Sequence, residues 1–133
     1  MGIEENKEVV KQLIEKVNKG DISALREHLT SNFVTHQAGS PDIDRDTYIE
    51  HALSRLGMIH TIDDMLAEGD KVFTRVTVRF PHEPSGNTIT AARFIVVRIE
   101  DGKLAESWSL ADKLGAYQQM GLLPPTEEPV SEI

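Results

Sequence analysis

Apolar residues recur at the spacing of a helix in the first half of the chain. They fall three or four positions apart over residues 4–18, 21–29 and 47–56, which predicts three amphipathic helices. Gly20 is placed to end the first helix, and Asp21 is placed to cap the second. Either Asp44 or Asp46 can cap the third. A short strand carrying His36 is expected over residues 32–37.

The pattern changes after Gly57 to the alternation of polar and apolar residues that is typical of strands. It predicts strands over residues 59–68, 71–81, 88–100 and 103–110, and a last helix over residues 113–120. Helices followed by a run of antiparallel strands predict an α+β fold.

Asp101 and Gly102 form the strongest turn signal, because an Asp-Gly pair between two apolar runs is typical of a two-residue hairpin loop. In a regular hairpin Glu100 faces Lys103, and this register fixes which side chains share a face of the sheet. The apolar members of one face are then Ile95, Val97, Ile99, Leu104, Trp108 and Leu110. The same face receives three ionisable residues, Arg93, Glu106 and Asp112. Carboxylates beside an arginine on an enclosed apolar face are typical of an acid/base site.

Composition narrows the class of protein. We expect one domain over residues 1–123 and a loose acidic tail over residues 124–133. The chain has no cysteine, which excludes disulfides and thiolate ligands. The net charge of −8 argues against binding to nucleic acid, which needs basic residues. No apolar run is long enough to cross a bilayer and no secretory signal is evident, so we expect a cytoplasmic protein without a membrane partner.

Three phrases, AEGDKV, EDGKLAESW and WSLADKLGAYQQMG, carry a resemblance to a known family. The last contains Trp108, Asp112, Gln119 and Gly121 at fixed spacing. The chain resembles the SnoaL-like polyketide cyclases, within the nuclear-transport-factor-two-like and ketosteroid-isomerase-like superfamily. This resemblance implies a cone in which a curved antiparallel sheet and the N-terminal helices close an internal pocket. It also implies a homodimer packed sheet against sheet, and ring closure by an aspartate without a metal or an organic cofactor.

By its place in the motif, the aspartate of the family corresponds to Asp112. Two readings of Asp112 stay open: a base in the pocket, or a cap for the helix that begins at Lys113. A capped carboxylate would have a low pKa and would be a poor base. Arg93 has two readings as well, since it could neutralise Glu106 or Asp112 or could bind a substrate oxyanion; a carboxylate partner is expected in either case.

The remaining candidates surround this centre. His36 precedes a Gly-Ser-Pro loop and is expected to face the cavity beside Asp112 and Arg93. The expected substrate-binding residues are Trp108, Phe33, Tyr48, Leu110, His60 and His82. The histidines lack the spacing that presents two imidazoles to one ion, so no metal site is expected.

Two hypotheses follow. The first is a cofactor-free acid/base enzyme, an isomerase or lyase, that cyclises or isomerises a small apolar oxygenated molecule of polyketide or steroid type. The alternative is a binding or dimerisation module that uses the same pocket without catalysis. Ser107 stands where the family often has histidine, and His82 lacks the glycines that often flank it, so the family's substrate is not carried over.

Overall fold

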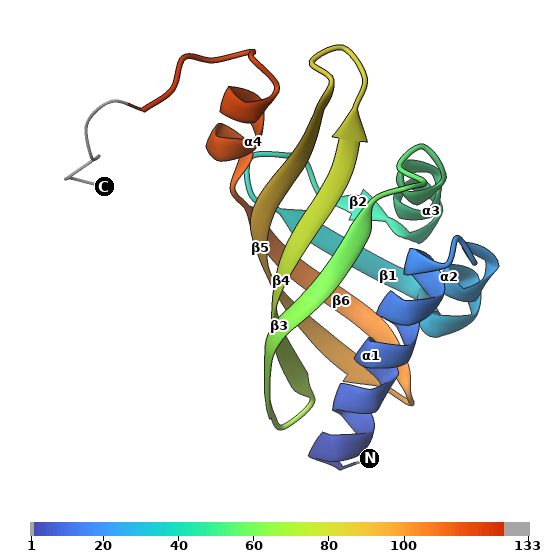
Figure 1. Cartoon of the computed structure of the whole chain (residues 1–133). Helices are drawn as coiled ribbons and strands as arrows, with labels where there is room; N and C mark the ends of the chain where they lie inside the picture. The colour runs from blue at the N-terminus through green and yellow to red at the C-terminus, as the bar shows by residue number, and fades with distance from the viewer. Residues whose placement is uncertain (1, 127–133) are drawn as a thin grey trace.

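The computed structural model describes residues 2–126 and shows helices packed on one curved sheet (Figure 1). The helices are α1 (Ile3–Asn18), α2 (Ser23–His28), α3 (Arg45–Leu53) and α4 (Lys113–Gln119). The strands are β1 (Leu29–Gln37), β2 (Ile43–Asp44), β3 (Ile59–Glu68), β4 (Lys71–His82), β5 (Asn87–Glu100) and β6 (Lys103–Ala111). The sheet order is β2-β1-β6-β5-β4-β3, and its paired strands are antiparallel except β1 and β6, which run parallel.

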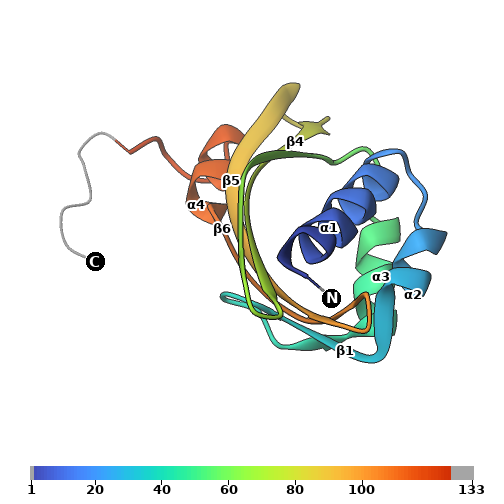
Figure 2. The same cartoon turned by 90° about the horizontal axis from the view of Figure 1, so that it is seen from below.

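The sheet curves around α1, and α2 and α3 lie at the open side of the curve (Figure 2). The buried core lies between these helices and the concave face of the sheet. It contains Val10, Leu13, Ile22, Leu25, Leu29, Phe33, Ile49, Val72, Val97, Ile99 and Leu104. The α+β prediction is confirmed, with the parallel β1–β6 pair making the sheet mixed rather than wholly antiparallel.

The helix ends follow from local chemistry. Gly20, just beyond α1, has a φ of 83°, a conformation that glycine adopts without strain. Asp44 caps α3, because its Oδ1 accepts a hydrogen bond from the Thr47 N–H at 2.9 Å. The predicted cap of α2 is wrong: its first flanking residue is Ile22, and Asp21 instead accepts a hydrogen bond from the Ser23 hydroxyl.

The Asp101-Gly102 turn is confirmed, with φ values of 51° and 76° at its two residues. Pairing starts as predicted, with Glu100 opposite Lys103 and Ile99 opposite Leu104. It then shifts by one residue, because Arg98 pairs with Glu106 and leaves Ala105 without an opposite residue. Ala105 therefore forms a β-bulge, in which Ala105 and Glu106 of β6 lie opposite the single residue Arg98 of β5.

The bulge overturns the predicted faces of β6. Ser107 and Ser109 now share the concave face with Arg93, and Trp108 and Leu110 lie on the convex outer face. The exposed fractions of Trp108 and Leu110 are 36% and 61%, so neither is a core residue. Placing both residues inside the fold was therefore wrong.

α4 is held against β5 by its last residue. The Gln119 side chain accepts a hydrogen bond from the Thr90 N–H at 2.8 Å and donates one to the Thr90 carbonyl at 2.7 Å. This bidentate contact gives a structural reason for glutamine at the end of the sequence motif.

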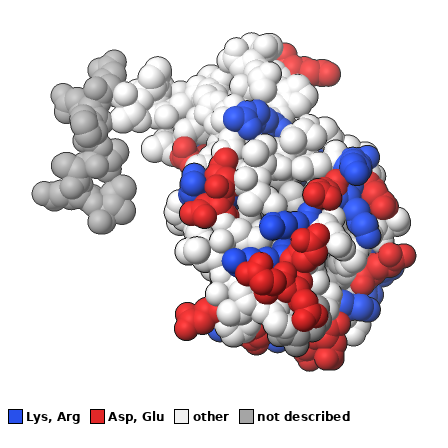
Figure 3. Space-filling model, turned by 60° about the horizontal axis from the view of Figure 1, so that its bottom comes forward, with Lys and Arg blue, Asp and Glu red and all other residues white. Residues whose placement is uncertain are grey.

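Acidic and basic side chains are interspersed on the surface seen in Figure 3. Within residues 2–126, no helix has the length and apolarity to cross a membrane. Residues 127–133, most of the predicted acidic tail, lie outside the described part of the chain.

Candidate functional site

Three adjoining pockets meet at Arg93. The inner pocket, with a cavity volume of about 80 Å³, lies between α1 and the concave sheet. The side pocket, of about 60 Å³, lies beneath α3 and the segment that follows it. The α4 pocket, of about 350 Å³, lies at the end of the sheet beside α4. Arg93 lines all three, and Tyr48 and His60 line the first two.

The walls of the inner pocket are largely apolar. They consist of Val10, Leu13, Ile14, Val17, Leu25, Phe33, Tyr48, His60, Thr74, Arg93, Ile95, Val97, Leu104 and Ser107. The Phe33 and Tyr48 rings pack at a centroid distance of 5.4 Å. A largely apolar pocket with a few polar side chains is typical of a site for a small organic ligand.

Arg93 is the polar centre of the cavity. It is half-buried, and its Nη2 donates a hydrogen bond to the Ser109 Oγ at 3.2 Å. Its buried Nε has no hydrogen-bond partner among residues 2–126, and no Asp or Glu of that range pairs with it. The expected carboxylate partner is therefore absent from the described chain, and the prediction of an ion pair was wrong.

Burial lowers the pKa of Arg93, while nearby Tyr48 raises it and Arg55 lowers it further. An arginine nonetheless keeps its charge at neutral pH, because its ordinary pKa is far above 7. The site thus places a cation with an unused donor against an apolar wall, an arrangement that favours a ligand oxygen bearing negative charge.

His60 enters the cavity from the second residue of β3. Asn18, the last residue of α1, fixes its backbone: the Asn18 Nδ2 donates to the His60 carbonyl at 2.8 Å, and the His60 N–H donates to the Asn18 Oδ1 at 2.9 Å. Burial, then Arg93 and Arg55, lower the pKa of His60 to about 4. The imidazole is therefore neutral at pH 7 and can accept a proton.

Asp112 takes the capping role that the sequence left open. Its Oδ1 accepts a hydrogen bond from the Gly115 N–H at 2.8 Å, at the start of α4. A Cβ at position 115 would collide with the Asp112 carboxylate, so Gly115 leaves the space that this cap needs. Asp112 also lines the α4 pocket beside Arg93, so its part in chemistry stays a prediction.

His36 lies on the other side of the sheet from Arg93. Its Nε2 is 2.6 Å from the Glu106 Oε2, its Nδ1 is 2.9 Å from the Asp42 Oδ1, and its ring stacks on Trp108 at 5.5 Å. The hydrogen bond with Glu106, followed by that with Asp42, raises the pKa of His36. The same contact with His36 lowers the pKa of Glu106. The structure does not bring His36 into the cavity. His36 pairs with Trp108 in the parallel register of β1 and β6, so both side chains lie on the outer face of the sheet.

Of the six expected substrate-binding residues, three line the inner pocket and three do not. Phe33, Tyr48 and His60 line the inner pocket. Trp108 and Leu110 line a shallow apolar depression on the outer face, with Phe94 and Val96 from β5. His82 lies at the end of β4, where its Nδ1 is 2.7 Å from the Ser85 Oγ, and it lines none of the three pockets.

Sequence reasoning missed Ser109, Arg55 and Asn18. Ser109 was assigned to the opposite face because the alternation gives no sign of the bulge at Ala105. Arg55 follows α3 and lines both the side pocket and the α4 pocket, a position that only the tertiary structure reveals. Asn18 reads as an ordinary last residue of a helix, and its bond to β3 spans 42 positions.

Residues 7–120 match the family model for SnoaL-like polyketide cyclases. The structure is similar to that of IdmH from Streptomyces antibioticus, a candidate polyketide cyclase, with 25% identity over 87% of this chain and 98% of that one and a TM-score of 0.78. A candidate polyketide cyclase from Bacillus cereus shares 26% identity over 90% of this chain and 82% of that one, with a TM-score of 0.76.

AclR from Streptomyces galilaeus, a candidate hydroxylase, is similar in fold with a TM-score of 0.85; it is 20% identical over 96% of this chain and 87% of that one. A comparison with curated proteins gives no match. Because the family model spans most of the chain and the solved structures share its fold, this chain belongs to the SnoaL-like polyketide cyclase family.

Proposed function

We propose that the chain is an acid/base enzyme that moves a proton on a small apolar ketone held in the inner pocket, with cyclisation or isomerisation as the result. One observation carries this proposal: Arg93, whose buried Nε has no hydrogen-bond partner within residues 2–126, lines an apolar cavity that also holds the neutral imidazole of His60. A cation beside a neutral base is what carbon-acid chemistry requires.

The chemistry would begin with the ketone oxygen on Arg93. His60 would take a proton from the carbon next to the carbonyl, and the electrons of the C–H bond would move to form an enolate whose oxygen is stabilised by Arg93. In an isomerisation, His60 would return the proton to a different carbon. In a cyclisation, the enolate carbon would attack a second carbonyl of the same molecule, and the resulting alkoxide would receive the proton from His60.

Several features support His60 rather than Asp112 as the base. The Asp112 carboxylate accepts the capping hydrogen bond of α4 and does not line the inner pocket. His60 lies in the inner pocket with Arg93, and Asn18 fixes its backbone. The low pKa of His60 makes it a weak base in the free protein, and negative charge that develops nearby would strengthen it.

The test measures exchange of the protons next to the carbonyl of 1-tetralone in D₂O, followed by NMR. We expect the protein to accelerate this exchange, and His60→Gln and Arg93→Met to lose about 10²-fold or more of that acceleration. His82→Gln is the matched control, because this histidine lies outside the three pockets, and it should retain the wild-type rate.

Asp112→Asn separates the two candidate bases, since asparagine keeps the cap and removes the carboxylate. Loss of exchange in Asp112→Asn with retention in His60→Gln would make Asp112 the base and overturn our assignment. Saturable binding of 1-tetralone without any acceleration would support the alternative, a binding module of the same fold.

We also propose that the chain forms a homodimer through its outer sheet face. Phe94, Trp108 and Leu110 are exposed there by 46%, 36% and 61%, and they adjoin one another across the paired strands β5 and β6. Large exposed apolar residues gathered on one sheet face are typical of a protein–protein contact. A second copy is the partner that the resemblance to the family implies.

A further inference from the structure

The pockets around Arg93 are lined mainly by basic residues, although the whole chain has a net negative charge. The chain has 22 acidic and 14 basic residues. The inner pocket and the side pocket nevertheless contain Arg93 and Arg55 and no Asp or Glu. In the α4 pocket the charged residues are these two arginines, Lys113 and Asp112.

Three of these four charged groups have a hydrogen-bond partner, since Arg93 donates to the Ser109 Oγ. Asp112 accepts the capping hydrogen bond from Gly115. Lys113 donates from Nζ to the Ala38 carbonyl at 3.0 Å and to the Ser40 Oγ at 3.3 Å. Asp112 forms no ion pair with an arginine of residues 2–126.

Arg93 and Arg55 also lack a carboxylate partner. Within residues 2–126 neither arginine forms an ion pair, both lower the pKa of His60, and Arg55 lowers the pKa of Arg93. Two guanidinium groups that line the same pockets repel each other, and desolvation adds to the cost for Arg93, whereas Arg55 is exposed. A bound anion would remove the repulsion and supply the missing acceptor.

We infer that the ligand of this cavity carries a carboxylate, held between Arg93 and Arg55, with its apolar body in the inner pocket. This inference rests on the proposed function only for the location of the ligand. The guanidinium fork can bind a carboxylate or a phosphate, and the smaller, singly charged carboxylate suits the largely apolar walls better. Arg93 has donors enough to bind one carboxylate oxygen and a ketone oxygen at once.

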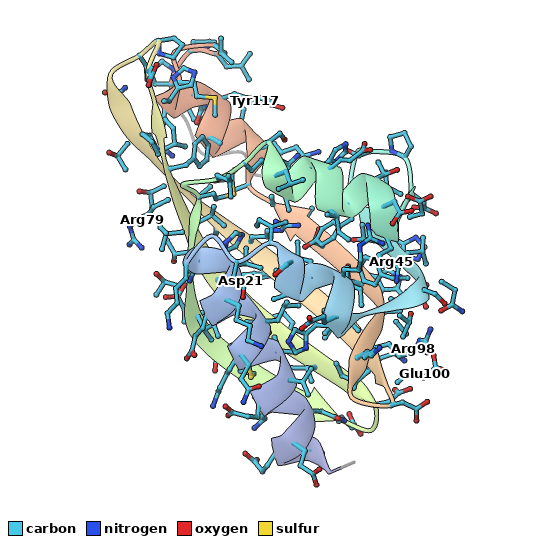
Figure 4. The ribbon with its side chains drawn as sticks, turned by 90° about the vertical axis from the view of Figure 1, so that its right-hand side faces the viewer. Asp21, Arg45, Arg79, Arg98, Glu100 and Tyr117 are labelled. Atoms are coloured by element: carbon cyan, nitrogen blue, oxygen red, sulfur yellow. The ribbon has the colours of Figure 1, made fainter. Side chains whose placement is uncertain are left out.

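Calorimetric titration with 2-naphthoate and with its neutral isostere 2-naphthamide tests the inference directly. We expect the wild-type protein to bind the acid about 10- to 100-fold more tightly, the range for a hydrogen bond to a charged group. Arg93→Met should abolish this preference, and Arg55→Met should reduce it. Arg79→Met, a change at an exposed arginine that projects from β4 away from the cavity (Figure 4), should leave it unchanged.

A second readout is independent of the variants. A carboxylate beside Arg93 should raise the pKa of His60, measured by NMR titration, and 2-naphthamide should leave it unchanged. Equal affinity for the acid and the amide would overturn the inference while leaving the proposed cavity intact. Binding of neither compound would overturn both. Acid preference retained in Arg93→Met and Arg55→Met would place the anion elsewhere and also overturn it.

Discussion

His60 gives the cavity its own pH dependence. A histidine in an unfolded chain titrates near its ordinary pKa of 6.5, and the folded protein lowers this pKa to about 4. Between these values the unfolded state binds a proton that the folded state does not, so His60 destabilises the fold as the pH falls. The loss is about 2 kcal/mol at pH 5 by this linkage.

We therefore predict that His60→Gln flattens the acid side of the stability curve. Urea unfolding at pH 7.5 and pH 5 should show a smaller loss of unfolding free energy in the variant than in the wild type. An identical loss in both proteins would mean that His60 does not titrate as the buried environment requires.

His36 should have the opposite effect. Its pKa is raised by its contacts with Glu106 and Asp42, so its contribution to stability is present below pH 6.5 and is lost as the pH rises through its folded pKa. We predict that His36→Gln costs stability at pH 5.5 and much less at pH 9, as measured by urea unfolding. A cost that does not change with pH would show that only packing on Trp108 is lost.

At the scale of the element, the bulge at Ala105 decides which side chains reach the cavity. We predict that deleting Ala105 leaves Trp108 and Leu110 on the outer face, because Glu106 then follows Leu104 directly and regular pairing keeps it opposite Arg98. Ala105→Gly keeps the residue count and should cost about 1 kcal/mol. Urea unfolding measures the cost of Ala105→Gly. A blue shift of Trp108 fluorescence in the deletion variant would report a buried indole and would contradict the assigned register.

The hairpin of β5 and β6 shows which features could be predicted from the sequence and which could not. Strand β2 was not predicted. The ends of the other helices and strands were predicted to within about three residues, because their periodicity and turn residues are local signals. Arg93 was placed on the correct face since β5 keeps strict alternation. Ala105 resembles any other small strand residue, so everything on β6 beyond it was assigned to the wrong face. The contact between Asn18 and His60 joins two elements and leaves no local pattern at all.

At the scale of the whole molecule, the outer face makes the oligomeric state testable. We predict a dimer of twice 14.8 kDa by light scattering, converted to monomer by Leu110→Glu or Phe94→Glu, because each introduces a charge into the apolar contact. Leu122→Glu alters a residue exposed by 65% beyond α4 and should leave the dimer intact. A wild-type monomer at high protein concentration would refute the outer-face interface.

Helix α1 contributes to the inner pocket in two separate ways. Its last residue, Asn18, holds the backbone of His60 by two hydrogen bonds, whereas earlier residues, among them Val10 and Ile14, form part of the apolar wall. Exchanging these wall residues for larger or smaller ones changes the shape of the inner pocket and leaves the anchoring of the imidazole in place. Such a protein can acquire new ligands by single substitutions in α1 while His60 and Arg93 keep their positions. Helix α1 is therefore the first element to vary in a redesign of ligand specificity.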